Sequence, residues 1–391
     1  MKLSARLSRI KPSPTLAVTA RAAALRAEGR DILSLSAGEP DFDTPLFVAE
    51  AGIAAIRAGH TRYTDVGGTP AIKDAIIAKF RRDNGLTYGR EQILVSTGAK
   101  QTIYNLAMAL LDAGDEVLIP APYWVSYPDI VLLAEATPVV IAAGADQGYK
   151  ITPAQLEGAI TPRTRLLMLN SPCNPTGAAY SRAELEALGE VLARHPRVVI
   201  ATDDIYEHVW WGPEPFCSLA TACPALYERT VTINGVSKSH AMTGWRIGYV
   251  CGDPDLLAAM RKVHQYTIMS APTTGQAAAL AALTAEGDRY VEEMRQEYDR
   301  RRRLIVDGFN TLGLDCFEPR GAFYAFPSIA KTGMSSDDFA MRLLDEEEVA
   351  MVPGDAFGAS GAGFVRASYA TAYEKIEEAL NRLERFMRRH G

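Results

Sequence analysis

One lysine, Lys238, stands where an amine could act as a nucleophile. The apolar, β-branched run at residues 231–234 predicts a buried strand, and Lys238 follows it after Gly235-Val236-Ser237. Burial disfavours the charged form of a lysine and leaves an amine that can form a Schiff base with an aldehyde. Arg246, further along the same segment, offers a planar set of donors for a phosphate. Taken alone, Lys238 could equally be a solvated loop lysine.

An aspartate, Asp203, ends a second apolar run at residues 198–202 and precedes Tyr206 by three positions. A carboxylate at the end of a buried strand is costly to ionise without a cationic partner, and a protonated pyridine nitrogen would serve as one. A helix N-cap or turn aspartate remains the alternative.

Small residues at a predicted helix start, Thr97-Gly98-Ala99-Lys100, expose N–H groups that suit a phosphate. The segment is not a Walker A loop, and no G-x-G-x-x-G follows a strand, which argues against nucleotide binding. The segment Asn170-Ser171-Pro172-Cys173-Asn174-Pro175-Thr176-Gly177 also follows a strand, where it could be a simple turn.

The composition excludes several classes of protein. The 391 residues carry a formal net charge of −6, and the only dense basic run, residues 300–303, is interpreted as a solvated helix face, so no nucleic-acid partner is expected. Five cysteines without a CxxC pair and six scattered histidines indicate neither disulfides nor a metal site. The charged N-terminus and the absence of a long apolar window predict a cytoplasmic protein with no membrane partner.

Strands and helices alternate between residues 93 and 250, which predicts an α/β fold with a mostly parallel sheet of the seven-stranded type, flanked by helices. Beyond a long helix near residues 289–312 the pattern becomes α+β. We predict an N-terminal arm with part of a small domain at 1–46, a large cofactor-binding domain at 47–288 and a C-terminal small domain at 289–391. A helix at 122–134 is among the predicted elements.

Together these motifs resemble the class I, fold-type I aminotransferases that depend on pyridoxal 5'-phosphate. Residues 235–248, GVSKSHAMTGWRIG, match the cofactor-attachment motif of that family. Companion motifs follow in the family's order along essentially the whole chain, namely Ala37-Gly38-Glu39-Pro40-Asp41, Tyr63, Tyr123-Trp124, Asn174-Pro175-Thr176-Gly177, Asp203-Asp204-Ile205-Tyr206, Gly321-Ala322-Phe323-Tyr324 and Val365-Arg366. Many relatives carry a serine or threonine where this chain has Gly235, so Ser237 or backbone amides would replace that phosphate contact.

The resemblance implies a role for each chemical group. Lys238 would hold the cofactor and later act as base and acid, and Asp203 would keep the pyridine nitrogen protonated. Tyr206 and Asn174 would hydrogen-bond the ring's phenolate oxygen, and Trp124 would stack on the ring.

The anionic groups would have their own partners. The phosphate would be held by Arg246, by the amides of Gly98, Ala99 and Lys100, and by Tyr63 of a second subunit, which makes the protein a homodimer. Arg366 would clamp the substrate's α-carboxylate as a bidentate fork, with Gly38 and Asn174 nearby.

Lys11, Thr15 and Lys100 match positions where relatives receive the second carboxylate of a dicarboxylic substrate. The sequence therefore predicts an aminotransferase that moves the amino group of aspartate, or a related dicarboxylic or aromatic amino acid, to 2-oxoglutarate by a ping-pong mechanism. Aromatic, prephenate or diaminopimelate-type aminotransferases remain alternatives, as does a β-eliminating C–S lyase. An effector-binding regulator is a further alternative, and it would need an added DNA-binding domain.

Overall fold

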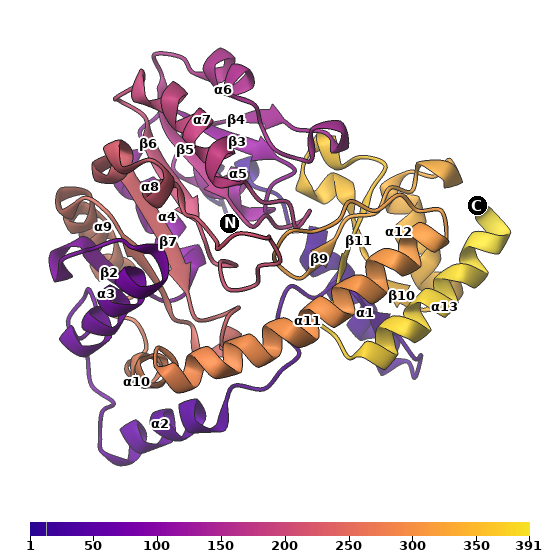
Figure 1. The fold of residues 1–391 in the computed structure, drawn as a ribbon, viewed down its shortest axis with the longest axis horizontal. Coiled ribbons are helices and arrows are strands. Elements are labelled where there is room, and N and C mark those ends of the chain that lie inside the picture. The colour runs from indigo at the N-terminus through magenta and orange to yellow at the C-terminus, as the bar shows by residue number, and fades with distance from the viewer. Residues whose placement is uncertain (13) are drawn as a thin grey trace.

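The computed structural model describes residues 1–12 and 14–391 and contains a large central sheet with helices on both faces (Figure 1). The sheet has seven strands in the order β2-β8-β7-β6-β5-β3-β4. Their bounds are β2 Ile93–Ser96, β3 Glu116–Ala121, β4 Thr137–Ala142, β5 Thr164–Asn170, β6 Val199–Asp203, β7 Thr230–Gly235 and β8 Gly248–Cys251. The predicted α/β class is confirmed.

The sheet is parallel except for β8, which runs antiparallel to both β2 and β7. In β5, Leu166 and Met168 pack into one hydrophobic cluster, and Leu167 and Leu169 pack into another. Both faces of the strand are therefore covered, which explains why the strands appear as continuous apolar runs rather than as alternating ones.

Thirteen helices accompany the strands in the described part of the chain. They are α1 Pro14–Ala27, α2 Leu46–Arg57, α3 Pro70–Asn84, α4 Ala99–Leu110, α5 Ser126–Leu133, α6 Pro153–Ala159, α7 Arg182–Ala193, α8 Leu219–Ala222, α9 Pro254–Thr267, α10 Thr273–Ala282, α11 Ala285–Thr311, α12 Ser336–Glu347 and α13 Tyr373–His390. Side chains of α4, α5 and α9 cover one face of the sheet, and those of α6, α7 and α8 cover the other. Across residues 1–12 and 14–391, no helix has the length and apolar character needed to span a bilayer.

Capping residues set several of these helix ends. Thr69 accepts a hydrogen bond from the N–H of Ile72 at the start of α3, and Gly85 ends that helix in the left-handed region at φ 66°. The predicted helix at 122–134 starts too early, because α5 begins only at Ser126. Residues 122–125 instead form the loop that brings Trp124 to the cavity described below.

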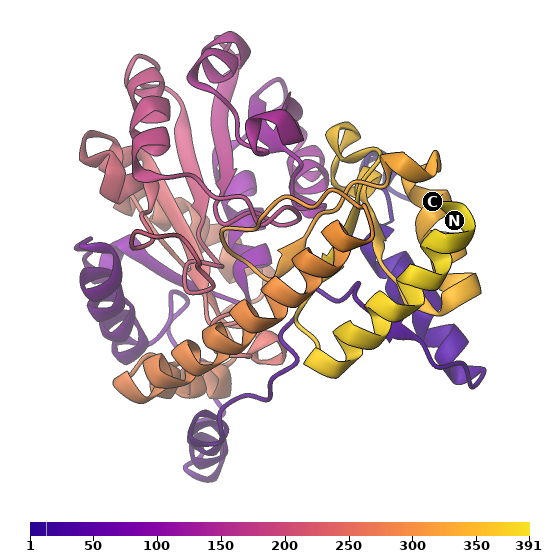
Figure 2. The ribbon, with the colours of Figure 1, turned by 45° about the vertical axis from the view of Figure 1, so that its right-hand side comes forward.

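A smaller α+β assembly joins the N-terminal segment to the C-terminal part of the chain. Strand β1 (Leu33–Ser34) pairs in parallel with β10 (Val349–Ala350). Beside them β11 (Val352–Pro353), β12 (Val365–Ser368) and β9 (Tyr324–Ala325) form an antiparallel sheet. Helices α11 and α13 run side by side along this assembly in both views (Figures 1 and 2). The domain boundaries stay a prediction.

The interpretation of the basic run at 300–303 as a solvated helix face holds for Arg300 and Arg303, which are exposed, and is wrong for the two arginines between them. Arg301 and Arg302 are buried. Arg301 donates to Asp41 at 2.7 Å and to Glu297 at 2.9 Å, and Arg302 pairs with Asp299. The run of four arginines in the sequence does not show which of them have carboxylate partners, and it is these partners that allow Arg301 and Arg302 to be buried.

Lys79 of α3 and Glu207, which lies in the turn after β6, form a buried ion pair. Glu207 also accepts hydrogen bonds from Asn234 of β7 at 2.7 Å and from Asn84 at 2.9 Å. Burial opposes the ionisation of Glu207, but the charges of Lys79 and His208 together with the hydrogen bonds from Lys79 and Asn84 outweigh it and lower the pKa of that carboxyl to about 2.

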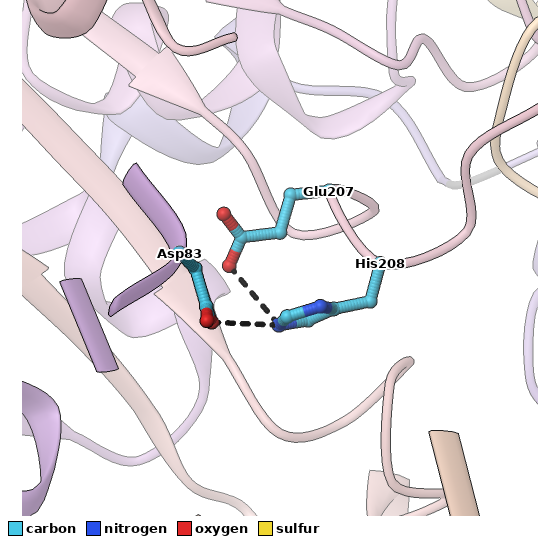
Figure 3. Close-up of side chains that lie close together, drawn as sticks. All are labelled: Asp83, Glu207 and His208. Carbon is cyan, nitrogen blue, oxygen red and sulfur yellow. Dashed lines mark ion pairs between the residues drawn. The ribbon is translucent and has the colours of Figure 1, made fainter. Parts of the chain in front are cut away.

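Three side chains of metal-binding type, Asp83, Glu207 and His208, lie together at this place (Figure 3). The His208 Nε2 atom is 3.7 Å from Asp83 and 3.4 Å from Glu207. The Lys79 ammonium contacts Glu207 and lies 3.9 Å from Asp83, so the cluster already contains its cation. The cluster links α3 to β7 and to the turn after β6.

Replacing Lys79 by methionine would leave the Glu207 carboxylate buried without its cation. We expect Lys79→Met to lower the free energy of unfolding by about 3–5 kcal/mol, measured by urea denaturation at pH 7. The control Lys262→Met, on an exposed site of α9, should change it by less than ~0.5 kcal/mol. Equal effects of the two substitutions would contradict this account of the buried pair.

Candidate functional site

A cavity of about 450 Å³ opens where β5, β6 and β7 end, and residues of the smaller assembly close its other side. Eleven of the predicted site residues line it, namely Thr15, Gly38, Ala99, Lys100, Trp124, Asn174, Asp203, Tyr206, Lys238, Arg246 and Arg366. Residues far apart in the sequence thus meet at the carboxyl edge of the sheet, where ligands of such folds bind.

Lys238 lines this cavity, and its amine donates a hydrogen bond to the carbonyl oxygen of Gly38 at 2.6 Å. Burial lowers the pKa of Lys238 to about 8, reinforced by Arg246 and Arg366 and opposed by Glu39. A lysine with this pKa supplies a reactive neutral amine near physiological pH far more readily than a solvated one.

The carboxylate of Asp203 is buried at the end of β6. Its Oδ2 atom accepts a hydrogen bond from the Tyr127 hydroxyl at 2.6 Å, and Oδ1 accepts one from the N–H of Ile205 at 3.4 Å. Burial raises the pKa of Asp203 to about 6, despite these bonds and the nearby charge of Lys238. A cationic ligand group would relieve the cost of this buried charge.

Arg366, on β12, faces the cavity from the smaller assembly and is 2% exposed. It donates to the Asn174 side-chain oxygen and to the Ser36 carbonyl, each at 2.8 Å. Its Nε–H has no partner among the described residues. A buried, unpaired guanidinium donor at a cavity wall is suited to bind a carboxylate.

The start of α4 and Arg246 form an anion-binding corner. Gly98 caps α4 at φ 82° and offers no side chain to its first turn, so N–H groups of that turn remain for a ligand. A Cβ at Gly98 would lie 2.3 Å from the Arg246 guanidinium, which explains the glycine although Gly98 itself is not a lining residue. Arg246 donates to the Thr243 carbonyl at 2.6 Å.

The structure gives a steric reason for Gly235, at a position where many relatives carry a serine or threonine. A Cβ there would lie 2.9 Å from the carbonyl oxygen of Ile247 and 3.1 Å from Gly248 Cα. The close approach of β7 and β8 therefore leaves no room for a serine or threonine, and Ser237 lines the cavity instead.

Two other candidate residues, Tyr63 and Lys11, lie outside the cavity lining, and so does the thiol-bearing residue Cys173, which precedes Asn174. Tyr63 is 82% exposed and does not line the cavity of its own chain. Lys11 is exposed on the N-terminal segment. Cys173 donates weakly to the Pro122 carbonyl, and burial raises the pKa of its thiol to about 11, so it is not an activated nucleophile.

Sequence reasoning assigned no role to Tyr127, Glu39 or Tyr324. Tyr127 bonds the Asp203 carboxylate, and Glu39 accepts a hydrogen bond from Thr243 at 3.0 Å. The Tyr324 hydroxyl lies 2.8 Å from that of Tyr206. Tyr324 belongs to the motif Gly321-Ala322-Phe323-Tyr324, but its contact with Tyr206 depends on how the two parts of the chain pack together.

The expected cofactor has three features that need partners, and the cavity supplies each. An aldehyde needs an amine, which Lys238 offers, and a protonated ring nitrogen needs a buried carboxylate, which Asp203 offers. A phosphate needs uncapped N–H groups and a cation, which the start of α4 and Arg246 offer. The residues present therefore fit pyridoxal phosphate.

Comparisons with known proteins agree with this geometry. The profile of the family "Aminotransferase class I and II" matches residues 30–383. The chain is 51% identical to an aspartate/prephenate aminotransferase of Cereibacter sphaeroides, covering 98% of each chain. The structure of the aspartate aminotransferase from Rhizobium meliloti superposes with a TM-score of 0.96 at 46% identity over 100% of both chains. That of Thermus thermophilus aspartate aminotransferase with maleate gives 0.94 at 42% identity over 98% of this chain and 99% of the other. The chain therefore belongs to the class I and II aminotransferases and depends on pyridoxal phosphate.

Proposed function

We propose that the protein transfers the amino group of aspartate to 2-oxoglutarate. The observation that carries the proposal is the meeting of the Lys238 amine, the Asp203 carboxylate and the Arg366 guanidinium in one cavity. The names of the relatives support the substrate, since they are aspartate or aspartate/prephenate aminotransferases, and the Thermus thermophilus enzyme was solved with the dicarboxylate maleate. The double name makes prephenate a second candidate amino acceptor.

Each reacting group has a proposed role. Pyridoxal phosphate, when bound, supplies a protonated ring that withdraws electrons from the substrate's α-carbon. Asp203 keeps its charge against that ring nitrogen, Tyr206 and Asn174 donate hydrogen bonds to the ring oxygen, and Trp124 packs on the ring face. Because Asn174 already accepts from Arg366 through its oxygen, its side-chain nitrogen remains the donor for this task.

The substrate is oriented from the opposite wall. Arg366 binds the α-carboxylate with Gly38 and Asn174 alongside, which directs the bond to the α-hydrogen toward Lys238. The Lys238 amine, whose pKa is lowered by burial, then takes the proton from the α-carbon and returns it on the cofactor side. Ala99, Lys100, Gly98 and Arg246 hold the phosphate.

Three residues near the cavity mouth would select a second carboxylate. Lys100 places its ammonium 4.9 Å from the centre of the Trp124 ring, and Thr15 lines the cavity beside it. Lys11 precedes them on the exposed N-terminal segment and would complete the set. Flexible cations at the mouth suit aspartate, 2-oxoglutarate and prephenate alike.

The exposure of Tyr63 supports a proposed homodimer. The residue is 82% exposed and so available to a second copy, and other large apolar side chains are exposed as well, among them Leu46, Ile53, Ile56, Tyr266 and Ile268. We propose that the Tyr63 hydroxyl reaches the phosphate of the partner's cavity. We also propose a cytoplasmic enzyme with a large domain at 47–288, in keeping with five free cysteines in the described chain.

A panel of amino donors with 2-oxoglutarate tests the function. We expect aspartate to give the highest kcat/KM, with phenylalanine and tyrosine lower. Glutamate is assayed with oxaloacetate as the acceptor, because its transfer to 2-oxoglutarate would regenerate the same two compounds. Stoichiometric formation of oxaloacetate from aspartate separates transamination from C–S lyase chemistry, which would release pyruvate and ammonia without an acceptor. Negligible turnover of both dicarboxylic amino acids would refute the proposed substrate.

Replacing Lys100 by methionine keeps the apolar stem and removes the charge. If Lys100 binds the distal carboxylate, kcat/KM for aspartate should fall by about 10- to 100-fold, the worth of one charge-assisted hydrogen bond, while that for phenylalanine changes little. Lys262→Met serves as the control. If kcat/KM falls equally for aspartate and phenylalanine, Lys100 acts on the cofactor and does not bind the substrate's distal carboxylate.

Complementation tests the contribution of Tyr63. Tyr63→Ala and Lys238→Ala should each be nearly inactive, but a co-expressed hybrid contains one site with Lys238 from one chain and intact Tyr63 from the other. We expect that hybrid, purified with two different tags, to recover substantial activity per dimer. No recovery would mean that Tyr63 serves the site of its own chain, and full activity of Tyr63→Ala alone would mean that it serves no site.

A further inference from the structure

The side chain that links the two halves of the cavity is Tyr324, at the start of β9. Its hydroxyl oxygen is 2.8 Å from that of Tyr206, which follows β6. Its ring lies 4.5 Å from the guanidinium carbon of Arg366. One fully buried residue therefore touches both the arginine proposed to bind the substrate's carboxylate and the tyrosine proposed to contact the cofactor.

The number of hydrogens limits what this hydroxyl pair can do. Each tyrosine hydroxyl donates a single hydrogen, so one oxygen of the pair must donate and the other must accept. If Tyr206 gives its hydrogen to the cofactor's ring oxygen, only Tyr324 is left to donate within the pair. Burial raises the pKa of both tyrosines, with Arg366 opposing the rise in each, so both keep their hydrogens at neutral pH.

We propose that Tyr324 is a positioning residue that donates its hydroxyl hydrogen to Tyr206 and thereby directs the hydrogen of Tyr206 toward the cofactor's ring oxygen. The inference rests on the proposed function, because it takes Tyr206 as a cofactor contact. A hydroxyl that accepts a hydrogen bond is also a stronger donor, so Tyr324 strengthens the bond that Tyr206 makes.

The surroundings leave room for this arrangement. A Cβ at Gly38 would lie 3.1 Å from the Tyr324 hydroxyl, so the glycine keeps that side open. The charged groups that face the pair are Asp203 beside Tyr206 and Arg366 beside both tyrosines, and Tyr298 of α11 is also near Tyr324. The ring of Tyr324 packs on Arg366 independently of its hydroxyl, which lets the two parts be tested apart.

Tyr324→Phe removes only the hydroxyl, and the readout is the visible absorption of the bound cofactor as a function of pH in the purified holoenzyme. A weaker bond from Tyr206 stabilises the deprotonated ring oxygen less, so the midpoint of the absorption change should rise by about 0.5 to 1 pH unit. Tyr298→Phe is the matched control, since it removes a buried hydroxyl that has no partner in the described chain, and its midpoint should equal that of the wild type.

The coupling to Tyr206 is tested by a double variant. In a Tyr206→Phe background, Tyr324→Phe should produce no additional shift, because the hydroxyl through which it acts is gone. An equal shift in both backgrounds, or no shift in the single variant, would overturn the proposal.

The ring gives a second, kinetic readout. Tyr324→Leu should raise KM for aspartate about tenfold by removing the surface on which Arg366 packs, whereas Tyr324→Phe should leave that KM near the wild-type value. An equal rise for both variants would place the hydroxyl on the substrate and contradict a positioning role. If the wild-type protein develops no cofactor absorption, the proposed function is overturned together with this inference. If the wild-type enzyme turns over normally but Tyr324→Phe leaves the pH midpoint of the absorption change where it was, only this inference is overturned.

Discussion

The buried carboxylate of Asp203 is the constraint on which the rest of the site depends. Its hydrogen-bond partners, the Tyr127 hydroxyl and the Ile205 N–H, are neutral, and burial holds the pKa of Asp203 near 6. Such a buried charge costs free energy, and a cationic ligand group would relieve that cost. A protonated pyridine ring is such a group, and the Lys238 amine, whose pKa burial lowers to about 8, lies in the same cavity to bind its aldehyde.

The architecture explains how these groups come together. Parallel strands end at one edge of the sheet, so Asp203 at the end of β6 and Lys238 just beyond β7 face the same space. The Lys79–Glu207 pair beneath them links α3 to β7 and to the turn that carries Tyr206. Arg366 comes from β12 of the smaller assembly, whose position is fixed in part by the pairing of β1 with β10. The catalytic geometry thus depends on contacts between the first and last parts of the chain.

Much of this could be predicted from the sequence because local signals carry it. Apolar runs predicted the strands, and helix ends depend on residue types that can be recognised locally, as at Thr69, Gly85 and Ser181. The order of motifs indicated which side chains should meet in the cavity. Pro122 misled the prediction of α5, because a proline suits both a helix start and the loop that is found there.

Contacts across the fold were beyond such signals. The inward turn of Arg301 and Arg302, the Tyr127 bond to Asp203 and the Tyr206–Tyr324 pair depend on which elements pack together. The Lys79–Glu207 pair joins residues more than a hundred positions apart, and neither side chain stands in a recognisable motif. Polar side chains that pair across long distances in the chain produce no repeating pattern of residue types, so a single sequence does not reveal them.

The central claim is that Lys238 is the amine that binds the cofactor, opposite the buried Asp203. Borohydride reduction of the purified protein, followed by digestion and mass spectrometry, fixes the cofactor to the lysine that holds it. The account predicts one modified peptide, with the vitamin B6 group on Lys238. Modification of another lysine, or none after incubation with pyridoxal phosphate, would contradict it.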